Sequence, residues 1–158
     1  MIIVMPDANR GQRGYFNSIS GDWRYEDFFF EELMPYVEKT YRIKGEKRYR
    51  AVAGLSMGGG GSFMYALHHP EQQSYFEAHS ALSLIENTPA KVLKTVRWFI
   101  DCGDDDFLYE GNSLVHIALR KKEVAHEYRV RDGGHSWTYW RASLPVVLEF
   151  ISDAFHQH

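Results

Sequence analysis

Several features that mark special classes of protein are scarce or missing in this sequence. One cysteine, Cys102, stands in 158 residues, and this excludes a disulfide-stapled fold because an internal bridge needs two. No apolar run approaches the roughly 20 residues of a membrane helix, and the apolar opening at residues 1–5 is too short and lacks the basic start of a signal peptide. We therefore expect a soluble, cytoplasmic protein with no membrane partner, although a leader upstream of Met1 would allow secretion.

An excess of positive charge is also missing. The 18 basic and 21 acidic residues give a net charge of −3, so nucleic acid and anionic membranes are not expected as partners. The composition is 44% apolar, 25% charged and 15% aromatic, which is typical of a globular chain. We expect one domain spanning residues 1–158.

Short apolar runs alternate with longer amphipathic ones along the chain. Strands are predicted at residues 2–5, 49–54, 75–82, 96–101 and 126–130. Helices are predicted at residues 26–41, through 64–67, and at 89–93, 112–123 and 143–155, while a long loop covers 7–24. This alternation indicates an α/β fold with a mostly parallel sheet of about five strands.

The sharpest local motif is Gly54-Leu55-Ser56-Met57-Gly58, a G-x-S-x-G between a predicted strand and a predicted helix. That context is typical of a nucleophile elbow, where Ser56 projects from a strained turn and flanking glycines allow close backbone approach. The helix start aims the Met57 N–H at a developing oxyanion. A plain Gly-rich turn is the alternative, whereas a phosphate loop would need a Lys-Ser/Thr ending that is missing.

A base and an acid for Ser56 follow in the chain order Ser, Asp, His. Residues 104–106 are three aspartates after the predicted strand 96–101, and His135 follows the predicted strand 126–130. Both lie at carboxyl ends of strands, where open α/β sheets place functional groups. The aspartates could instead form a solvated turn, but their spacing does not fit a calcium loop, and no H-E-x-x-H or Cys/His cluster offers zinc ligands. Trp137 either packs or lines an acyl pocket.

Five segments together resemble the putative-esterase family of α/β-hydrolases, which includes esterase D (S-formylglutathione hydrolase), tributyrin esterases and feruloyl or acetyl-xylan esterases. They are residues 4–7, 31–37, 53–60, 101–109 and 132–137. The resemblance implies a three-layer α/β-hydrolase sandwich and carboxylester hydrolysis through an acyl-enzyme, without metal or organic cofactor. It implies Ser56 as nucleophile, His135 as base and Asp106 as acid, with Asp105 in reserve.

Two departures from the family pattern stand out. The chain starts at what resembles the fourth strand, and it has no His-Gly dipeptide, the motif whose loop supplies the second oxyanion-hole amide in the family. A lid-like insertion that usually precedes residue 84 is also missing. We therefore expect an incomplete domain with an open sheet edge, which favours closure by a second copy of the chain.

The function we expect is that of a serine carboxylesterase. Its substrates would be small-molecule esters or acylated carbohydrates carrying short-chain acyl, acetyl or feruloyl groups, with Trp137 contacting the substrate. A thioesterase or a peptidase would use the same triad. The alternative from another class is a catalytically weak or inactive hydrolase-fold protein that serves as a binding or oligomerising unit.

Overall fold

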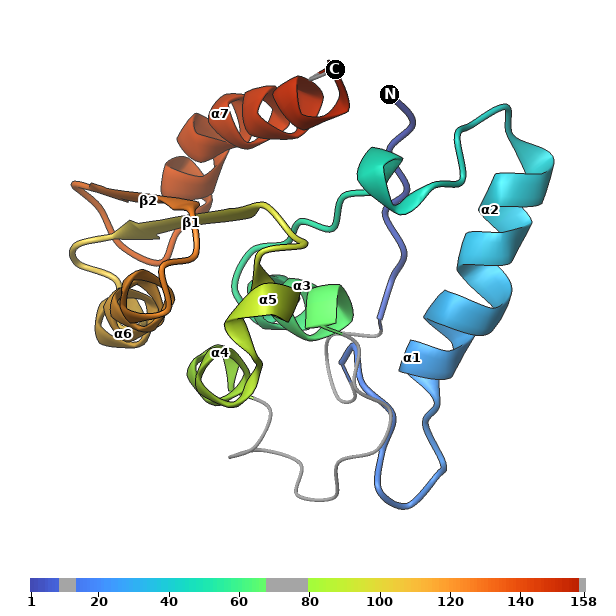
Figure 1. Ribbon diagram of the computed structural model, residues 1–158, viewed down its shortest axis with the longest axis horizontal. Coiled ribbons are helices and arrows are strands. Elements are labelled where there is room, and N and C mark those ends of the chain that lie inside the picture. The colour runs from blue at the N-terminus through green and yellow to red at the C-terminus, as the bar shows by residue number, and fades with distance from the viewer. Residues whose placement is uncertain (9–13, 68–79, 157–158) are drawn as a thin grey trace. The chain divides into compact units, whose positions relative to one another are not determined.

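The computed structural model describes residues 1–8, 14–67 and 80–156 of the chain (Figure 1). These residues divide into two compact units, residues 1–61 and residues 62–158, which are described one at a time. The expectation of one domain spanning the whole chain stays a prediction. Among the described residues, no helix combines the length and the apolar character that a membrane crossing requires.

The second unit is built on two parallel strands. β1 (Trp98–Gly103) and β2 (His126–Arg131) pair in register, with Trp98 opposite His126. Both strands lie where the sequence predicts them, at 96–101 and 126–130. Parallel strands need a crossover connection, and α6 (Tyr109–Lys121) supplies it, close to the helix predicted at 112–123.

Helices cover both faces of this strand pair (Figure 1). Alternate side chains of β1 point to opposite faces. On one face, the Cys102 sulfur accepts a hydrogen bond from the Asn112 side chain of α6 at 3.6 Å. On the other, the Phe99 ring lies 5.2 Å from the ring of Phe150, a residue of α7 (Trp137–His156). The unit is thus a helix–sheet–helix sandwich, and α7 begins earlier than the helix predicted at 143–155.

Two short helices precede β1. In α4 (Ala81–Asn87), the Ser80 side chain accepts a hydrogen bond from the Ser83 amide at 3.1 Å and caps the helix. α5 (Ala90–Leu93) lies within the predicted helix 89–93. The strand predicted at 75–82 is wrong at its end, because the serine cap starts a helix there; its residues 75–79 lie outside the described residues.

A continuous helical segment of mixed type spans residues 25–40 of the first unit. α1 (Tyr25–Asp27), the π-helix η1 (Phe28–Leu33) and α2 (Met34–Thr40) follow one another without a break, in place of the single helix predicted at 26–41. Pro35 has no N–H for the carbonyl one turn back, and its ring would clash with that carbonyl in a regular helix. The wider π turn before it accommodates both effects.

Two predicted strands of the first unit are not strands in the described structure. Residues 2–5 lie outside the sheet and are exposed, with 88% of Met5 accessible. The prediction at 49–54 gives way to the 3₁₀ turn η2 (Lys47–Tyr49) and unpaired residues. A strand is held by hydrogen bonds to a neighbour rather than by its own sequence, so an apolar run predicts it only where a partner lies alongside. The described sheet has two strands, and the α/β class stands.

Candidate active site

The strained turn at Ser56 is the first element of the site, and it belongs to the first unit. Ser56 has φ +54°, a left-handed conformation that is uncommon for a residue with a side chain. A Cβ on Gly54 would lie 2.3 Å from the carbonyl carbon and oxygen of Gly58. Only glycine fits at position 54, because the chain doubles back so tightly there. The geometry is the one expected of a nucleophile elbow.

The helix α3 (Met57–Leu67) starts directly after Ser56. Met57 is its first residue, so the Met57 amide belongs to the first turn, where N–H groups have no acceptor within the helix. The amides of Gly58 and Gly59 donate to the carbonyls of Leu55 and Ser56, both at 2.9 Å, and these bonds fix the turn. The Met57 amide and the positive end of the helix dipole thus lie beside the serine.

A partly buried acid–base pair is the second element, and it lies within the second unit. The Nδ1 of His135 is 2.8 Å from the Oδ2 of Asp106. The Asp106 side chain is 6% exposed and that of His135 is 22% exposed. A buried carboxylate only accepts hydrogen bonds, so Nδ1 carries the proton and Nε2 keeps its lone pair. The other Asp106 oxygen accepts the Leu108 amide at 2.9 Å, which fixes the carboxylate.

Hydrogen bonds join the loop that carries Asp106 to the loop that carries His135. The Asp104 amide donates to the Arg131 carbonyl and the Asp105 amide donates to the Gly133 carbonyl, both at 3.1 Å. The Gly133 amide donates back to the Asp104 carboxylate, also at 3.1 Å. The two loops continue the strand pairing of β1 and β2 beyond the strand ends, so the pair is held by backbone contacts.

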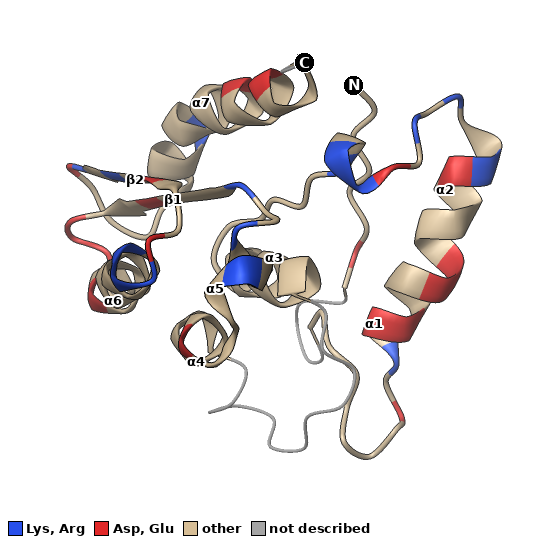
Figure 2. Ribbon diagram, viewed as in Figure 1, with Lys and Arg blue, Asp and Glu red and all other residues tan. Residues whose placement is uncertain are grey.

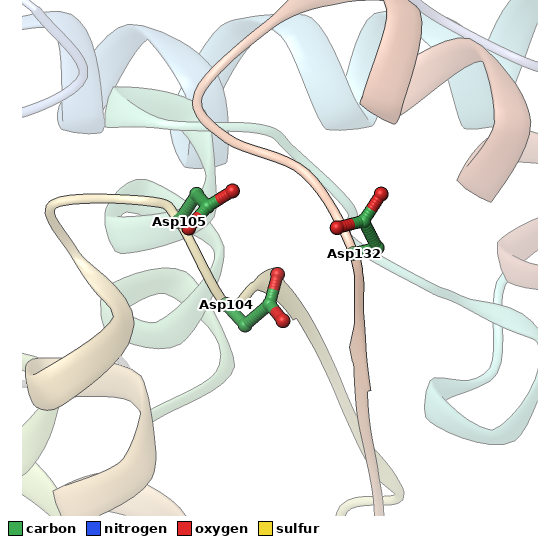
Figure 3. A group of neighbouring side chains, drawn as sticks. All are labelled: Asp104, Asp105 and Asp132. Atoms are coloured by element: carbon green, nitrogen blue, oxygen red, sulfur yellow. The ribbon is translucent and has the colours of Figure 1, made fainter.

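The choice between two adjacent aspartates is made by geometry. Asp106 is buried against His135, while Asp105 is exposed. The carboxylates of Asp104, Asp105 and Asp132 lie within 4.8 Å of one another (Figure 3), in the acidic stretch after β1 (red in Figure 2) and the loop after β2. Carboxylates of this kind suit a hard cation, but exposed acidic groups often gather without one, and we assign no metal to them.

Aromatic rings surround the imidazole. The Phe107 ring is 4.7 Å from the His135 ring, and the Trp140 ring meets it edge-on at 4.8 Å. Trp137 packs edge-to-face on Trp140 at 5.4 Å and is itself exposed. Phe107 was not predicted as a neighbour of His135, although its place directly after Asp106 is a usable signal. The Phe107 and Trp140 rings thus contact the imidazole from two residues close to it in the structure.

Cys102, the one cysteine, lies close to this pair and is buried. Burial, together with the charges of Asp106 and Asp101, raises the pKa of the Cys102 thiol to about 11. The thiolate is the nucleophilic form of cysteine, so the thiol stays protonated and unreactive at neutral pH. Ser56 and Cys102 therefore do not compete for the role of nucleophile.

The chain is similar in sequence and in structure to known esterases. Residues 1–151 match the family model described as "Putative esterase". The endo-1,4-beta-xylanase/feruloyl esterase of Xylanibacter ruminicola is 32% identical over 130 residues, which are 80% of this chain and 18% of that protein. A solved ferulic acid esterase is 36% identical with a TM-score of 0.80, and the match covers 90% of this chain and 65% of that one.

A further solved structure supports the fold alone. It is the fluorophosphonate-binding serine hydrolase FphF of Staphylococcus aureus, which is 20% identical with a TM-score of 0.72 over 87% of this chain and 66% of that chain. The match thus spans 18% of the length of the Xylanibacter ruminicola protein and about two thirds of the length of these two solved structures. Family model, sequence identity and fold agree, and the chain belongs to the putative-esterase family of α/β-hydrolases.

Proposed function

We propose that this chain is a serine carboxylesterase that hydrolyses small-molecule esters, with Ser56 as nucleophile, His135 as general base and acid, and Asp106 as the orienting carboxylate. The observation that carries the proposal is the Asp106–His135 bond of 2.8 Å, together with the left-handed Ser56 directly before α3. The family membership and the feruloyl esterase relatives support the same chemistry.

In the acylation half of the reaction, the Ser56 hydroxyl attacks the ester carbonyl carbon while its proton passes to Nε2 of His135. The carbonyl π electrons move onto the oxygen, and the Met57 amide stabilises that oxyanion. When the tetrahedral intermediate collapses, the bond to the alcohol oxygen breaks and His135 returns the proton to the leaving alkoxide. Asp106 stabilises the imidazolium through its bond to Nδ1.

In the deacylation half, water takes the place of the serine hydroxyl. His135 accepts a proton from the water as it attacks the acyl-enzyme carbonyl, and it then returns the proton to Ser56 as the carboxylic acid leaves. The same three side chains serve both halves, and no oxidant, reductant or further group is needed. We propose short-chain acyl, acetyl and feruloyl esters, including acylated carbohydrates, as substrates, with the exposed Trp137 at the acyl side.

The test measures hydrolysis of p-nitrophenyl acetate by the wild type and by three variants. Ser56→Ala should abolish turnover with the fold intact, and Asp106→Asn should lower kcat by about 10⁴-fold because the imidazole loses its tautomer. Asp105→Asn is the matched control, because its carboxylate is exposed whereas that of Asp106 bonds Nδ1 of His135, and it should keep near-wild-type turnover. Equal turnover in Ser56→Ala and wild type would refute the assignment.

The alternative is a catalytically weak or inactive hydrolase-fold protein that binds or oligomerises. The exposed apolar residues 1–5 favour it, because an exposed apolar stretch is typical of an interaction surface, and a homodimer is the simplest such assembly. Stoichiometric labelling of Ser56 by a fluorophosphonate would reject this alternative, whereas no labelling and a dimeric mass in solution would support it.

A further inference from the structure

A partly buried polar network joins three elements of the second unit next to the histidine loop. The Tyr139 hydroxyl of α7 donates a hydrogen bond to Oδ1 of Asp101 on β1. The other oxygen of Asp101 pairs with the Arg131 guanidinium at the end of β2, at 2.7 Å. The Asp101 side chain is only 7% exposed, so its charge is satisfied by these two partners. A buried carboxylate held at both oxygens is fixed in position.

The network closes on itself through α7. Arg131 also donates to the hydroxyl of Ser143, and that hydroxyl donates to the Tyr139 carbonyl one turn back at 3.1 Å. The Arg131 guanidinium carbon lies 4.7 Å from the centre of the Tyr139 ring, a cation–π distance. Every member therefore has at least two partners, and the start of α7 is tied to the ends of both strands.

Tyr139 contacts the chain on both sides of His135. Its ring packs so closely on Gly133 that a Cβ there would lie 2.9 Å from the Tyr139 Cδ2. Its amide donates to the Ser136 hydroxyl at 3.3 Å. The short segment between Gly133 and Tyr139 carries His135, so the position of the Tyr139 ring determines where the imidazole can sit.

We propose that Tyr139 and Asp101 are positioning residues that hold the His135 imidazole against Asp106. The inference rests on the proposed function and adds to it a part of the site that lies behind the reacting groups. Tyr139 acts through Gly133 and Ser136, and Asp101 acts by anchoring the Tyr139 hydroxyl. Misplacing a catalytic group by about 1 Å can cost on the order of 10²-fold in rate, and this sets the expected size of the effect.

The phenol keeps its proton throughout the working pH range. Burial, followed by the hydrogen bond and charge of Asp101, raises the pKa of Tyr139 well above its ordinary value, although Arg131 opposes the shift. The hydroxyl is therefore always a donor to Asp101. The network is a fixed support, and a variant that removes only the hydroxyl isolates its contribution.

The experiment compares Tyr139→Phe with Tyr128→Phe. Each removes one hydroxyl from a hydrogen bond in the same unit, and the Tyr128 hydroxyl bonds Ser113 at 2.9 Å, so Tyr128→Phe controls for the loss of a tyrosine bond elsewhere. We measure kcat and KM on p-nitrophenyl acetate and the downfield proton resonance of the His135 Nδ1–H. Tyr139→Phe should lower kcat by about 10–100-fold with little change in KM and shift or broaden the resonance, and Tyr128→Phe should change neither.

Two outcomes would overturn the proposal: a wild-type kcat with a wild-type resonance in Tyr139→Phe, or equal losses in both variants. If Tyr139→Phe does not fold, Asp101→Ala replaces it, because alanine removes the acceptor of the Tyr139 hydroxyl and leaves Tyr139 itself unchanged. A lower kcat and a moved resonance then support the proposal, and wild-type values refute it. If the wild type itself shows no turnover and no fluorophosphonate labelling, the proposed function fails, whereas the resonance still tests the positioning.

Discussion

The closest backbone approach behind the site occurs at Gly103, the last residue of β1. A Cβ there would lie 1.8 Å from the Gly133 carbonyl oxygen and 2.6 Å from its carbon. Real Cβ atoms essentially never approach another atom closer than 3.0 Å. Gly103→Ala therefore forces the two loops apart by about 1 Å or more, since both partners of the clash are backbone and cannot rotate away.

The free energy of unfolding should fall for two reasons. Overpacking in a tight contact costs about 1–3 kcal/mol. Separating the loops also weakens the two backbone bonds from Asp104 to Arg131 and from Asp105 to Gly133, and each contributes about 0.5–1.5 kcal/mol. Together these effects predict a loss of about 2–6 kcal/mol. Because the same loops carry Asp106 and His135, turnover should fall as well.

Urea denaturation followed by circular dichroism measures the loss. Gly111→Ala is the matched control, because that glycine lies in α6 and a Cβ there would meet nothing within 4 Å. Alanine in a helix interior is better than glycine by about 0.5–1 kcal/mol, so the control should gain stability. If Gly103→Ala were as stable as Gly111→Ala, two conclusions would be refuted: the steric clash at Gly103, and the stabilising role of the hydrogen bonds between the two loops.

Two further predictions concern α6 and its end. Desolvation and the nearby positive charges of His126 and Arg120 lower the pKa of His116 in the folded protein. The unfolded chain therefore binds the proton more readily, and the free energy of unfolding falls as the pH drops below about 6.5. His116→Asn should flatten the dependence of Tm on pH between 7 and 5. The Lys122 ammonium donates to two carbonyls at the end of α4, at 2.7 and 2.8 Å; Lys122→Met should lower stability by about 1 kcal/mol in urea denaturation.

Most of the described second unit could be predicted from sequence because its elements carry their own signals; the start of α4, where a strand was predicted, is an exception. β1 has alternating burial, α6 has a helical apolar stripe, and residues 126–131 follow the same β-rich pattern. In the first unit, the strands predicted at residues 2–5 and 49–54 were wrong, because an apolar run becomes a strand only beside a hydrogen-bonded partner. The local sequence was therefore enough to predict a helix or strand where that element packs on elements close to it in the chain.

The site shows the same division between local and distant information. The elbow at Ser56 is set by five consecutive residues and was predictable. Asp105 and Asp106 are adjacent and chemically equal, and only the fold decides which carboxylate meets His135. The hydrogen bond between Tyr139 and Asp101 joins positions 38 residues apart. No sequence motif or spacing rule predicts a bond over that separation.

The hydrogen bonds described above for the loops of Asp106 and His135 lie within the second unit, whereas the proposed nucleophile belongs to the first. A perturbation confined to the first unit should therefore lower turnover while the downfield Nδ1–H resonance of His135 persists, because the Asp106 partner of Nδ1 lies in the second unit. Gly54→Ala is such a change, because its Cβ would lie 2.3 Å from the Gly58 backbone and would displace Ser56. Loss of that resonance in Gly54→Ala would contradict the view that the Asp106–His135 bond is held within its own unit.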